Sequence, residues 1–266
     1  MITVKSAREI ETMGQAGRVV GDTLALVRDH AAPGISTLEL DRVAEAFIRS
    51  HPGATPSFKG LYGFPATLCT SINSEVVHGI PSKKRVLAEG DILSVDVGVC
   101  IGGLHADAAL TVAVGEIAAA TRTLLEVTQQ ALAAGIAAAR ARGQVGDIGA
   151  AVQKVAEAAG FSVVRELVGH GIGTAFHEEP QVPNFGRAGT GPRLMPGMTI
   201  AIEPMVNGGR ADVRTLGDRW TVVTEDGSMS AHFEHTVAIT ESGPRILTLS
   251  EQAARAAAHA SSSSAS

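Results

Sequence analysis

The chain has 266 residues, of which 45% are hydrophobic and 18% are charged, so it predicts a globular protein with a large core and excludes a disordered polymer. Its formal net charge of −5 at pH 7, with scattered lysines and arginines, argues against direct binding of nucleic acid. The N-terminus has no apolar leader, and no stretch reaches the roughly 18 apolar residues that a membrane helix needs, so membrane binding is not predicted either.

Two helices are predicted at the start of the chain. Apolar residues recur every three or four positions across residues 7–27, which is one face of a helix. Ser36 and Glu39 then form a capping-box pattern ahead of a second amphipathic helix at residues 38–50. The inner stripe expected for this second helix consists of Leu40, Val43 and Phe47.

Strand patterns follow these helices, and the same order occurs again in the second half of the chain. Strands are expected at residues 66–73, 91–99 and 109–114, helices at 121–141 and 145–159, and further strands at 198–206, 220–225 and 232–240. This order predicts an α+β protein whose single domain, residues 1–250, has similar halves at about 1–115 and 116–250. The Ala/Ser-rich residues 251–266 have little to bury and are expected to form a disordered tail.

Two aspartates are predicted to face each other across a hairpin. In "ILSVDVGVC" the residue Asp96 lies on the strand face opposite to the valines, and the Gly102-Gly103 pair that follows suits a tight turn. The returning strand brings Asp107 to the same face whether the numbers of paired residues add up to 203 or to 205. Two facing carboxylates repel, and no Lys or Arg lies between positions 86 and 121 to neutralise them, so we expect a metal ion here.

Carboxylates also interrupt two apolar strand patterns in the second half. "MTIAIEPM" places Glu203 out of phase with the isoleucines, and "HFEHTVAIT" places Glu234 within an aliphatic strand. In "VGHGIGTAFHEEP" three glycines predict a turn flanked by His170 and His177. Four carboxylates with one imidazole suit Mn²⁺, Fe²⁺, Co²⁺ or Zn²⁺, and their charge is balanced by two divalent ions.

The sequence resembles the bacterial type I methionine aminopeptidases, which have the pita-bread fold. The resemblance runs from about residue 4 to 249 and is carried, in order and spacing, by "SINSEVVHGIP", "GDILSVDVGV", "HAD", "ELVGHGIG", "FHEEPQVPNFG", "MTIAIEPM" and "WTVVTEDGSMSAHFEHTVAIT". It implies a curved antiparallel sheet with two pairs of outer helices in pseudo-two-fold halves. It also implies a monomeric hydrolase that acts in the cytoplasm on the N-terminal methionine of nascent polypeptides, with contact to the ribosome as a family expectation. The chain has two cysteines and no C-x-x-C pair, which agrees with a reducing cytoplasm.

The resemblance assigns roles to the residues already singled out. It implies that Asp96 binds one ion, that Asp107 and Glu234 bridge two, and that His170 and Glu203 bind the other. His78 and His177 match two histidines beside the substrate, although His78 alone would equally suit a turn. The positions that match the methionine pocket are Phe58, Leu61, Tyr62, Phe64, Cys69, Phe176 and Trp220, of which Phe58 and Leu61 could as well be ordinary core residues.

The implied mechanism is attack of metal-activated water on the first peptide bond when the second residue is small. Glu203 would pass a proton to the leaving amine, and His78 and His177 would stabilise charge on the peptide. The chain departs from the family pattern at Ala108, where Thr or Ser is usual, and at His232, where Gln is common. We interpret His232 as a neutral variant, whereas loss of a hydroxyl at position 108 could alter metal preference.

Two other functions fit the same fold. An Xaa-Pro aminopeptidase or prolidase usually carries an extra N-terminal domain, whereas helices here begin within the first ten residues. A non-catalytic pita-bread protein that binds partners typically lacks some metal ligands, whereas this chain keeps all five.

Overall fold

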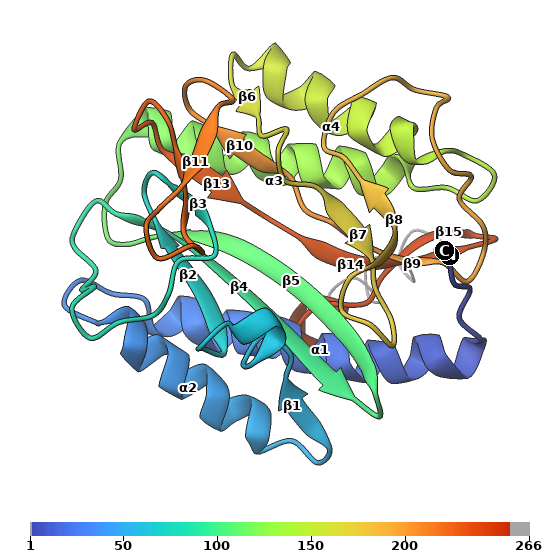
Figure 1. Cartoon of the computed structure of the whole chain (residues 1–266), viewed down its shortest axis with the longest axis horizontal. Coiled ribbons are helices and arrows are strands. Elements are labelled where there is room, and N and C mark those ends of the chain that lie inside the picture. Colours follow the sequence, from blue (N-terminus) through green and yellow to red (C-terminus); the bar gives the residue numbers. More distant parts are fainter. Residues whose placement is uncertain (1, 256–266) are drawn as a thin grey trace.

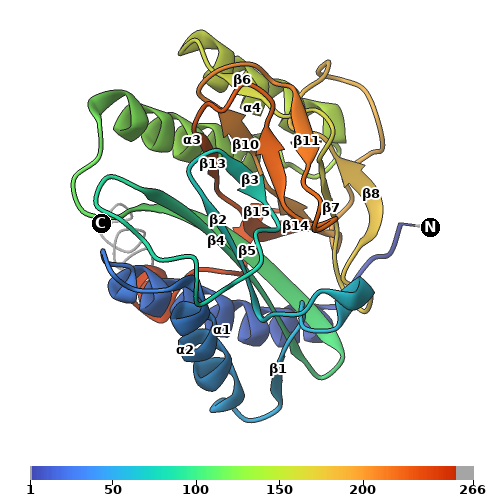
Figure 2. The ribbon, with the colours of Figure 1, turned by 60° about the vertical axis from the view of Figure 1, so that its left-hand side comes forward.

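The computed structural model describes residues 2–255 and places a pair of helices on each half of the strands (Figures 1 and 2). Helices α1 (Ala7–His30) and α2 (Thr37–Arg49) lie against the first half, and α3 (Ala119–Ala138) and α4 (Val145–Ala158) lie against the second. The predicted order of two helices followed by strands, occurring twice, is therefore present in the structure.

The strands of each half follow their helices. Those of the first half are β1 (Ala54–Pro56), β2 (Leu68–Ile72), β3 (Glu75–Val77), β4 (Ile92–Ile101) and β5 (Leu104–Ala113), with a short 3-10 turn at Leu61–Gly63. Those of the second half are β6 (Ser162–Val163), β7 (Gly169–Gly171), β8 (Glu178–Val182), β9 (Thr199–Ile202), β10 (Met205–Asn207), β11 (Val213–Thr215), β12 (Val222–Thr224), β13 (Ser230–His232), β14 (His235–Thr240) and β15 (Gly243–Ile246). All the strand pairings found in residues 2–255 are antiparallel, in the orders β1-β4-β2 with β5 on β4, β13-β10-β6, β11-β12-β3 and β15-β14-β9-β7-β8.

Helix α2 begins as predicted but buries a different stripe. The Ser36 side chain accepts from the Glu39 N–H, and the Glu39 side chain accepts from the Ser36 N–H, which completes the capping box. The predicted inner stripe is wrong at two positions, because Val43 and Phe47 are only half-buried. The buried residues are Thr37, Leu40, Asp41, Ala44 and Ile48. Asp41 can be buried because its carboxylate accepts hydrogen bonds from the N–H groups of Thr67 and Leu68. A pattern of apolar residues does not reveal such a role.

The hairpin of β4 and β5 places Asp96 and Asp107 on the same face, as predicted from the sequence. Asp96 pairs with Ala109, and Gly98 pairs with Asp107, so the two aspartates are diagonal neighbours on one face. Gly102 and Gly103 turn the chain with φ of 60° and 78°. Gly98 has to be small, because a Cβ there would lie 2.7 Å from the ring of Phe176.

The second pair of carboxylates lies in breaks between strands, which corrects the expectation of continuous strands. Glu203 follows the end of β9 and precedes β10, and Glu234 lies between β13 and β14. The two breaks face each other, because Ile202 pairs with His235 and Met205 pairs with His232. Each glutamate is therefore released from the alternating faces that a continuous ladder would impose.

The segment between His170 and His177 bends at residues 173–177, as the predicted turn requires, but Gly169–Gly171 form strand β7. None of Gly169, Gly171 and Gly173 has a positive φ. Glycine is needed for close packing instead: a Cβ on Gly169 would lie 2.4 Å from the Ala201 carbonyl oxygen, and one on Gly171 would lie 2.2 Å from that of Glu179.

Two threonine hydroxyls join the halves beside the hairpin. The Thr236 hydroxyl accepts from the Asp107 N–H at 2.9 Å and donates to the Asp107 carbonyl at 2.8 Å. The Thr111 hydroxyl accepts from the His232 N–H at 2.8 Å and donates to the His232 carbonyl at 2.9 Å. Between them, the Glu234 N–H donates to the Ala109 carbonyl at 2.9 Å. Side chains therefore replace a backbone ladder where β5 meets β13 and β14.

Each half has its own apolar core. One cluster packs α1 and α2 residues such as Val20 and Leu40 on β4 and β5, and another packs α3 and α4 residues such as Leu124 and Ile148 on β9 and β14. Leu110 contacts both clusters. No helix within residues 2–255 is long and apolar enough to cross a membrane. Residues 251–255 form a helical turn, and the rest of the expected tail, residues 256–266, lies outside the described part of the chain.

We predict that Thr236→Val lowers the free energy of unfolding by roughly 2–4 kcal/mol, because it leaves the buried Asp107 N–H and carbonyl unpaired at almost constant volume. Urea denaturation of the metal-stripped protein measures this change. The control is Thr123→Val on the exposed face of α3, for which we expect a change below about 0.5 kcal/mol. Equal effects of the two substitutions would contradict a special role for Thr236.

Candidate metal and peptide site

One cavity of about 210 Å³ brings together the residues predicted from the sequence. It lies where the β4–β5 hairpin meets the breaks at residues 203–204 and 233–234. The predicted residues that line it are Phe58, Leu61, Tyr62, Phe64, Cys69, His78, Asp96, Asp107, His170, Phe176, His177, Glu203, Trp220 and Glu234. Segments from both halves of the chain therefore build a single site.

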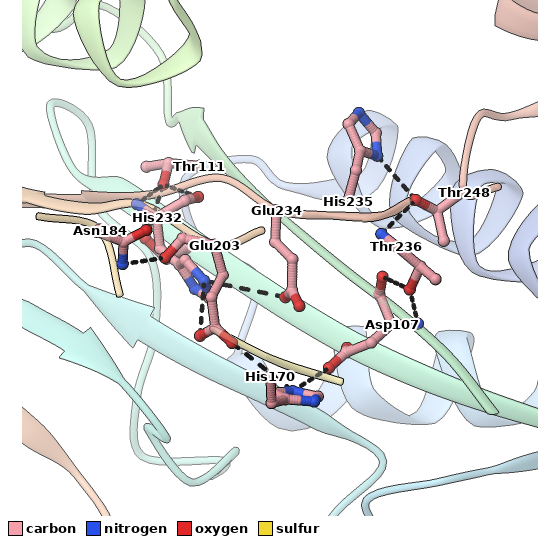
Figure 3. Close-up of polar contacts among 11 residues, drawn as sticks. Asp107, Thr111, His170, Asn184, Glu203, His232, Glu234, His235, Thr236 and Thr248 are labelled. Carbon is pink, nitrogen blue, oxygen red and sulfur yellow. Dashed lines mark hydrogen bonds and ion pairs between the residues drawn. The ribbon is translucent and has the colours of Figure 1, made fainter. Parts of the chain in front are cut away.

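Three of the proposed metal-binding side chains have donor atoms within 4.8 Å of one another, namely Asp107, His170 and Glu234. The His170 Nε2 lies 3.8 Å from Asp107 Oδ2 and 3.7 Å from Glu203 Oε1, which connects the fourth side chain to the group (Figure 3). Asp96, the fifth, lines the same cavity. These spacings exceed hydrogen-bond length and leave room for a cation between the donors.

The orientation of His170 is set by the adjacent backbone. Its Nδ1 lies 2.8 Å from the Gly171 carbonyl oxygen, which can only accept, so Nδ1 carries the proton. The unprotonated Nε2 therefore faces the carboxylates, which is the arrangement of a metal-binding histidine. Burial lowers the pKa of His170 to about 4, so the ring is neutral near pH 7.

The four carboxylates are held where water cannot stabilise their charges. Burial raises the pKa of Asp96 to about 7. It raises the pKa of Asp107, Glu203 and Glu234 well above the usual range, and the neighbouring carboxylates add to the shift. One oxygen each of Asp96, Asp107 and Glu234 is buried without a hydrogen-bond partner in the described structure. Unpaired buried oxygen atoms around an imidazole fit a divalent transition metal.

His78 and His177 lie on the cavity wall in less regular backbone. His78 has a φ of 61°, a left-handed conformation that is costly for a residue with a side chain and is common at functional sites. Burial lowers the pKa of His78 to about 4 and also lowers the pKa of His177. Both rings are therefore neutral near pH 7 and can donate an N–H. Tyr62 stacks on His177, with ring centroids 5.7 Å apart at the rim of the cavity.

The apolar wall consists largely of the predicted methionine-pocket residues. The Phe58 and Phe176 rings meet edge to face with centroids 5.3 Å apart, as do those of Phe64 and Trp220 at 5.1 Å. Cys69 is buried, and it pairs with Asp96 in the β2–β4 register, so the apolar wall directly adjoins the carboxylates. Aromatic edges around an apolar space suit a thioether side chain.

Five further lining residues were not predicted from the sequence, namely Val77, Leu167, Val168, Met205 and His232. The apolar ones give no signal beyond that of ordinary core residues. His232 was interpreted as a neutral variant, yet it lies in the cavity with its Nε2 4.0 Å from Glu203 and 4.0 Å from Glu234. Its position two residues before Glu234 gave no reliable signal, because Glu234 lies in a break where strand alternation does not hold.

Residues 11–241 match metallopeptidase family M24, which is the class of protein that this fold and site define. The chain is 55% identical over 249 residues to the methionine aminopeptidase of Clostridium perfringens, a match that covers 94% of this chain and 99% of that one. The solved methionine aminopeptidase of Thermotoga maritima is 44% identical with a TM-score of 0.92, covering 94% of this chain and 100% of that one. The chain therefore belongs to metallopeptidase family M24 and, within it, to the methionine aminopeptidases.

More distant structures share only the fold. The prolidase of Pyrococcus furiosus is 22% identical with a TM-score of 0.73, and the match covers 93% of this chain but 66% of that one. The predicted α+β pita-bread fold is thus confirmed. The comparisons also favour the methionine aminopeptidase interpretation over the Xaa-Pro alternative, because the close relatives are matched over almost their whole length.

We predict that the metal-stripped protein loses stability as the pH rises from about 7 to about 9. In this range histidines are neutral in the folded and unfolded states, whereas the unfolded carboxylates, with pKa near 4, are ionised. The folded Asp107, Glu203 and Glu234 have raised pKa values, so the folded state binds more protons and its stability falls with pH. Urea denaturation with a chelator measures this, and added Co²⁺ should reduce the slope to the part contributed by the thiols of Cys69 and Cys100, whose pKa values are also raised by burial. A stability that is flat or rises over this range contradicts the prediction.

Proposed function

We propose that this chain is a metal-dependent aminopeptidase that removes the N-terminal methionine of nascent proteins when the second residue is small. The observation that carries the proposal is the contact between an apolar, aromatic-walled cavity and four buried carboxylates with an imidazole. A volume of about 210 Å³ is below the roughly 300–1,000 Å³ of sites for drug-sized ligands, so it suits one side chain. The high identity to methionine aminopeptidases supports methionine as that side chain.

Asp96, Asp107, His170, Glu203 and Glu234 would hold two divalent ions, Co²⁺, Mn²⁺, Fe²⁺ or Zn²⁺. Two such ions balance the four negative charges of the carboxylates. When bound, they would supply an acidified water and polarise the first peptide carbonyl. The buried oxygen atoms that lack partners support this set of residues.

Glu203 is the proposed carrier of the proton that reaches the leaving amine. Its side chain is 14% exposed, compared with 4% for Asp107 and 1% for Glu234, so it is the most accessible to substrate of these three. His78 and His177, neutral and on the cavity wall, would donate N–H groups to the peptide as charge develops. The Tyr62–His177 stack at the rim would limit the space for the second residue of the substrate.

The setting of the reaction is part of the same proposal. The substrates would be polypeptides emerging from ribosomes in the cytoplasm, and the enzyme would act as a monomer. Two free cysteines, Cys69 and Cys100, agree with a reducing compartment.

We predict that metal-stripped protein resupplied with Co²⁺, Mn²⁺, Fe²⁺ or Zn²⁺ releases methionine from Met-Ala-Ser, and that Met-Leu-Ser and Ala-Pro-Ala are poor substrates. Asp107→Asn should remove activity, because it deletes a charge from the proposed bridging position. Chromatographic detection of free amino acids measures this. Preference for Ala-Pro-Ala would support a prolidase-like activity, and no cleavage with any metal would support a binding role.

We predict that His177→Ala lowers kcat about 10²–10³-fold on Met-Ala-Ser while metal content stays constant, because a donor to the developing charge is lost. Steady-state kinetics and metal analysis of the same samples test this. His30→Ala, at the exposed end of α1, is the matched control and should leave both values unchanged. Loss of metal in His177→Ala would instead show that His177 supports the ion.

A further inference from the structure

His232 is a buried imidazole that faces Glu203 and Glu234 but is not one of the five metal ligands proposed above. Its exposed fraction is 1%, and its Nε2 has no hydrogen-bond partner in the described residues. Figure 3 shows its side chain directed toward the carboxylates of Glu203 and Glu234. Burial of a ring nitrogen without a partner lowers the stability of the folded state, so we looked for a ligand that this atom could bind.

The distances around His232 suit a shared ion better than a hydrogen bond. Its Nε2 lies 4.0 Å from Glu203 Oε2 and 4.0 Å from Glu234 Oε2. A hydrogen bond would need about 2.7–3.2 Å. Two donors on one tetrahedral metal ion each lie about 2.0–2.2 Å from it and about 3.3–3.6 Å from each other, so a small movement of the ring would let His232 share an ion with one of these carboxylates.

His170 has nearly the same relation to the carboxylates from the other side. Its Nε2 is 3.7 Å from Glu203 Oε1 and 3.8 Å from Asp107 Oδ2. Glu203 therefore has one imidazole near each of its two oxygens (Figure 3). His232 therefore lies at nearly the same distance from two carboxylates as His170 does, although His170 alone of the two belongs to a group of three donors within 4.8 Å of one another.

We propose that His232 is a second imidazole ligand of the metal centre and binds a divalent first-row ion on the side of Glu203 and Glu234. This inference rests on the proposed metal-dependent function. A neutral imidazole adds a donor without adding charge to a site that already has four carboxylates, and it suits Co²⁺, Fe²⁺ and Zn²⁺.

His235 provides a matched control on the same segment. It lies three residues further along, and its Nδ1 is 2.8 Å from the Thr248 hydroxyl. Figure 3 shows it pointing away from the carboxylates, toward Thr248. His235→Gln therefore makes the same chemical change as His232→Gln without altering the proposed site.

The experiment compares wild type, His232→Gln and His235→Gln after metal removal. Pulsed electron paramagnetic resonance of the Mn²⁺-loaded proteins detects nitrogen atoms bonded to the ion, and calorimetric titration gives the Co²⁺ affinity. We expect coupling to two imidazoles in wild type and in His235→Gln, and to one in His232→Gln. The Co²⁺ affinity of His232→Gln should fall by about tenfold or more. Thermal melting of the metal-stripped proteins checks folding, and His232→Asn serves if the glutamine variant does not fold.

Three results separate failure of this inference from failure of the proposed function. Coupling to the same nitrogens in wild type and His232→Gln overturns the inference, even if affinity falls, because His232 would then act only by holding a carboxylate. Wild type that binds no ion and releases no methionine overturns both the inference and the proposed function. Wild type that is active with a single coupled imidazole overturns the inference alone.

Discussion

Four carboxylates that converge in a buried space are the constraint on which the rest of this structure depends. Asp96 and Asp107 come from one hairpin, and Glu203 and Glu234 come from the other half of the chain. Their burial and, for Asp107, Glu203 and Glu234, their mutual repulsion work against folding whenever they are ionised, as their raised pKa values indicate. A metal centre that neutralises them therefore also stabilises the contact between the halves, so metal binding and the joining of the halves are coupled.

The backbone around these carboxylates leaves the proposed ligands outside the strand ladder and still satisfies its own polar groups. Breaks at residues 203–204 and 233–234 release the glutamates from the strand alternation, but they also end the ladder. The Phe233 N–H then donates to the Pro204 carbonyl, and the Glu234 N–H donates to the Ala109 carbonyl. With the hydroxyls of Thr111 and Thr236, these bonds keep the interrupted region paired without a continuous sheet.

The sequence was informative where chemistry and periodicity coincide. Strand alternation predicts Asp96 and Asp107 on one face, because side chains alternate with a period of two and every pairing with an odd sum of residue numbers keeps these two on the same side. It could not show the breaks at Glu203 and Glu234, because the flanking residues have ordinary strand propensities. The sequence also could not show that Gly171 is needed for close packing and not for a turn, because both roles require glycine. His232 was undervalued because its role depends on a contact across the breaks, which only the three-dimensional structure shows.

Metal binding and peptide binding, the two kinds of binding proposed for this site, need backbone of different regularity. The fold places the residues for each in different kinds of segment. The proposed metal ligands lie on strands or next to strand ends, where paired backbone fixes donor positions to the accuracy that an ion requires. Most residues proposed to contact peptide lie outside the strands, with Cys69 of β2 as an exception, and both Tyr62 and His78 have left-handed backbone with φ of 52° and 61°. Such conformations persist only where the surrounding structure imposes them. The residues of a polypeptide substrate beyond the first one vary, so segments with irregular backbone suit its recognition. Irregular backbone at Asp107 or His170 would instead weaken binding of the proposed metal ion.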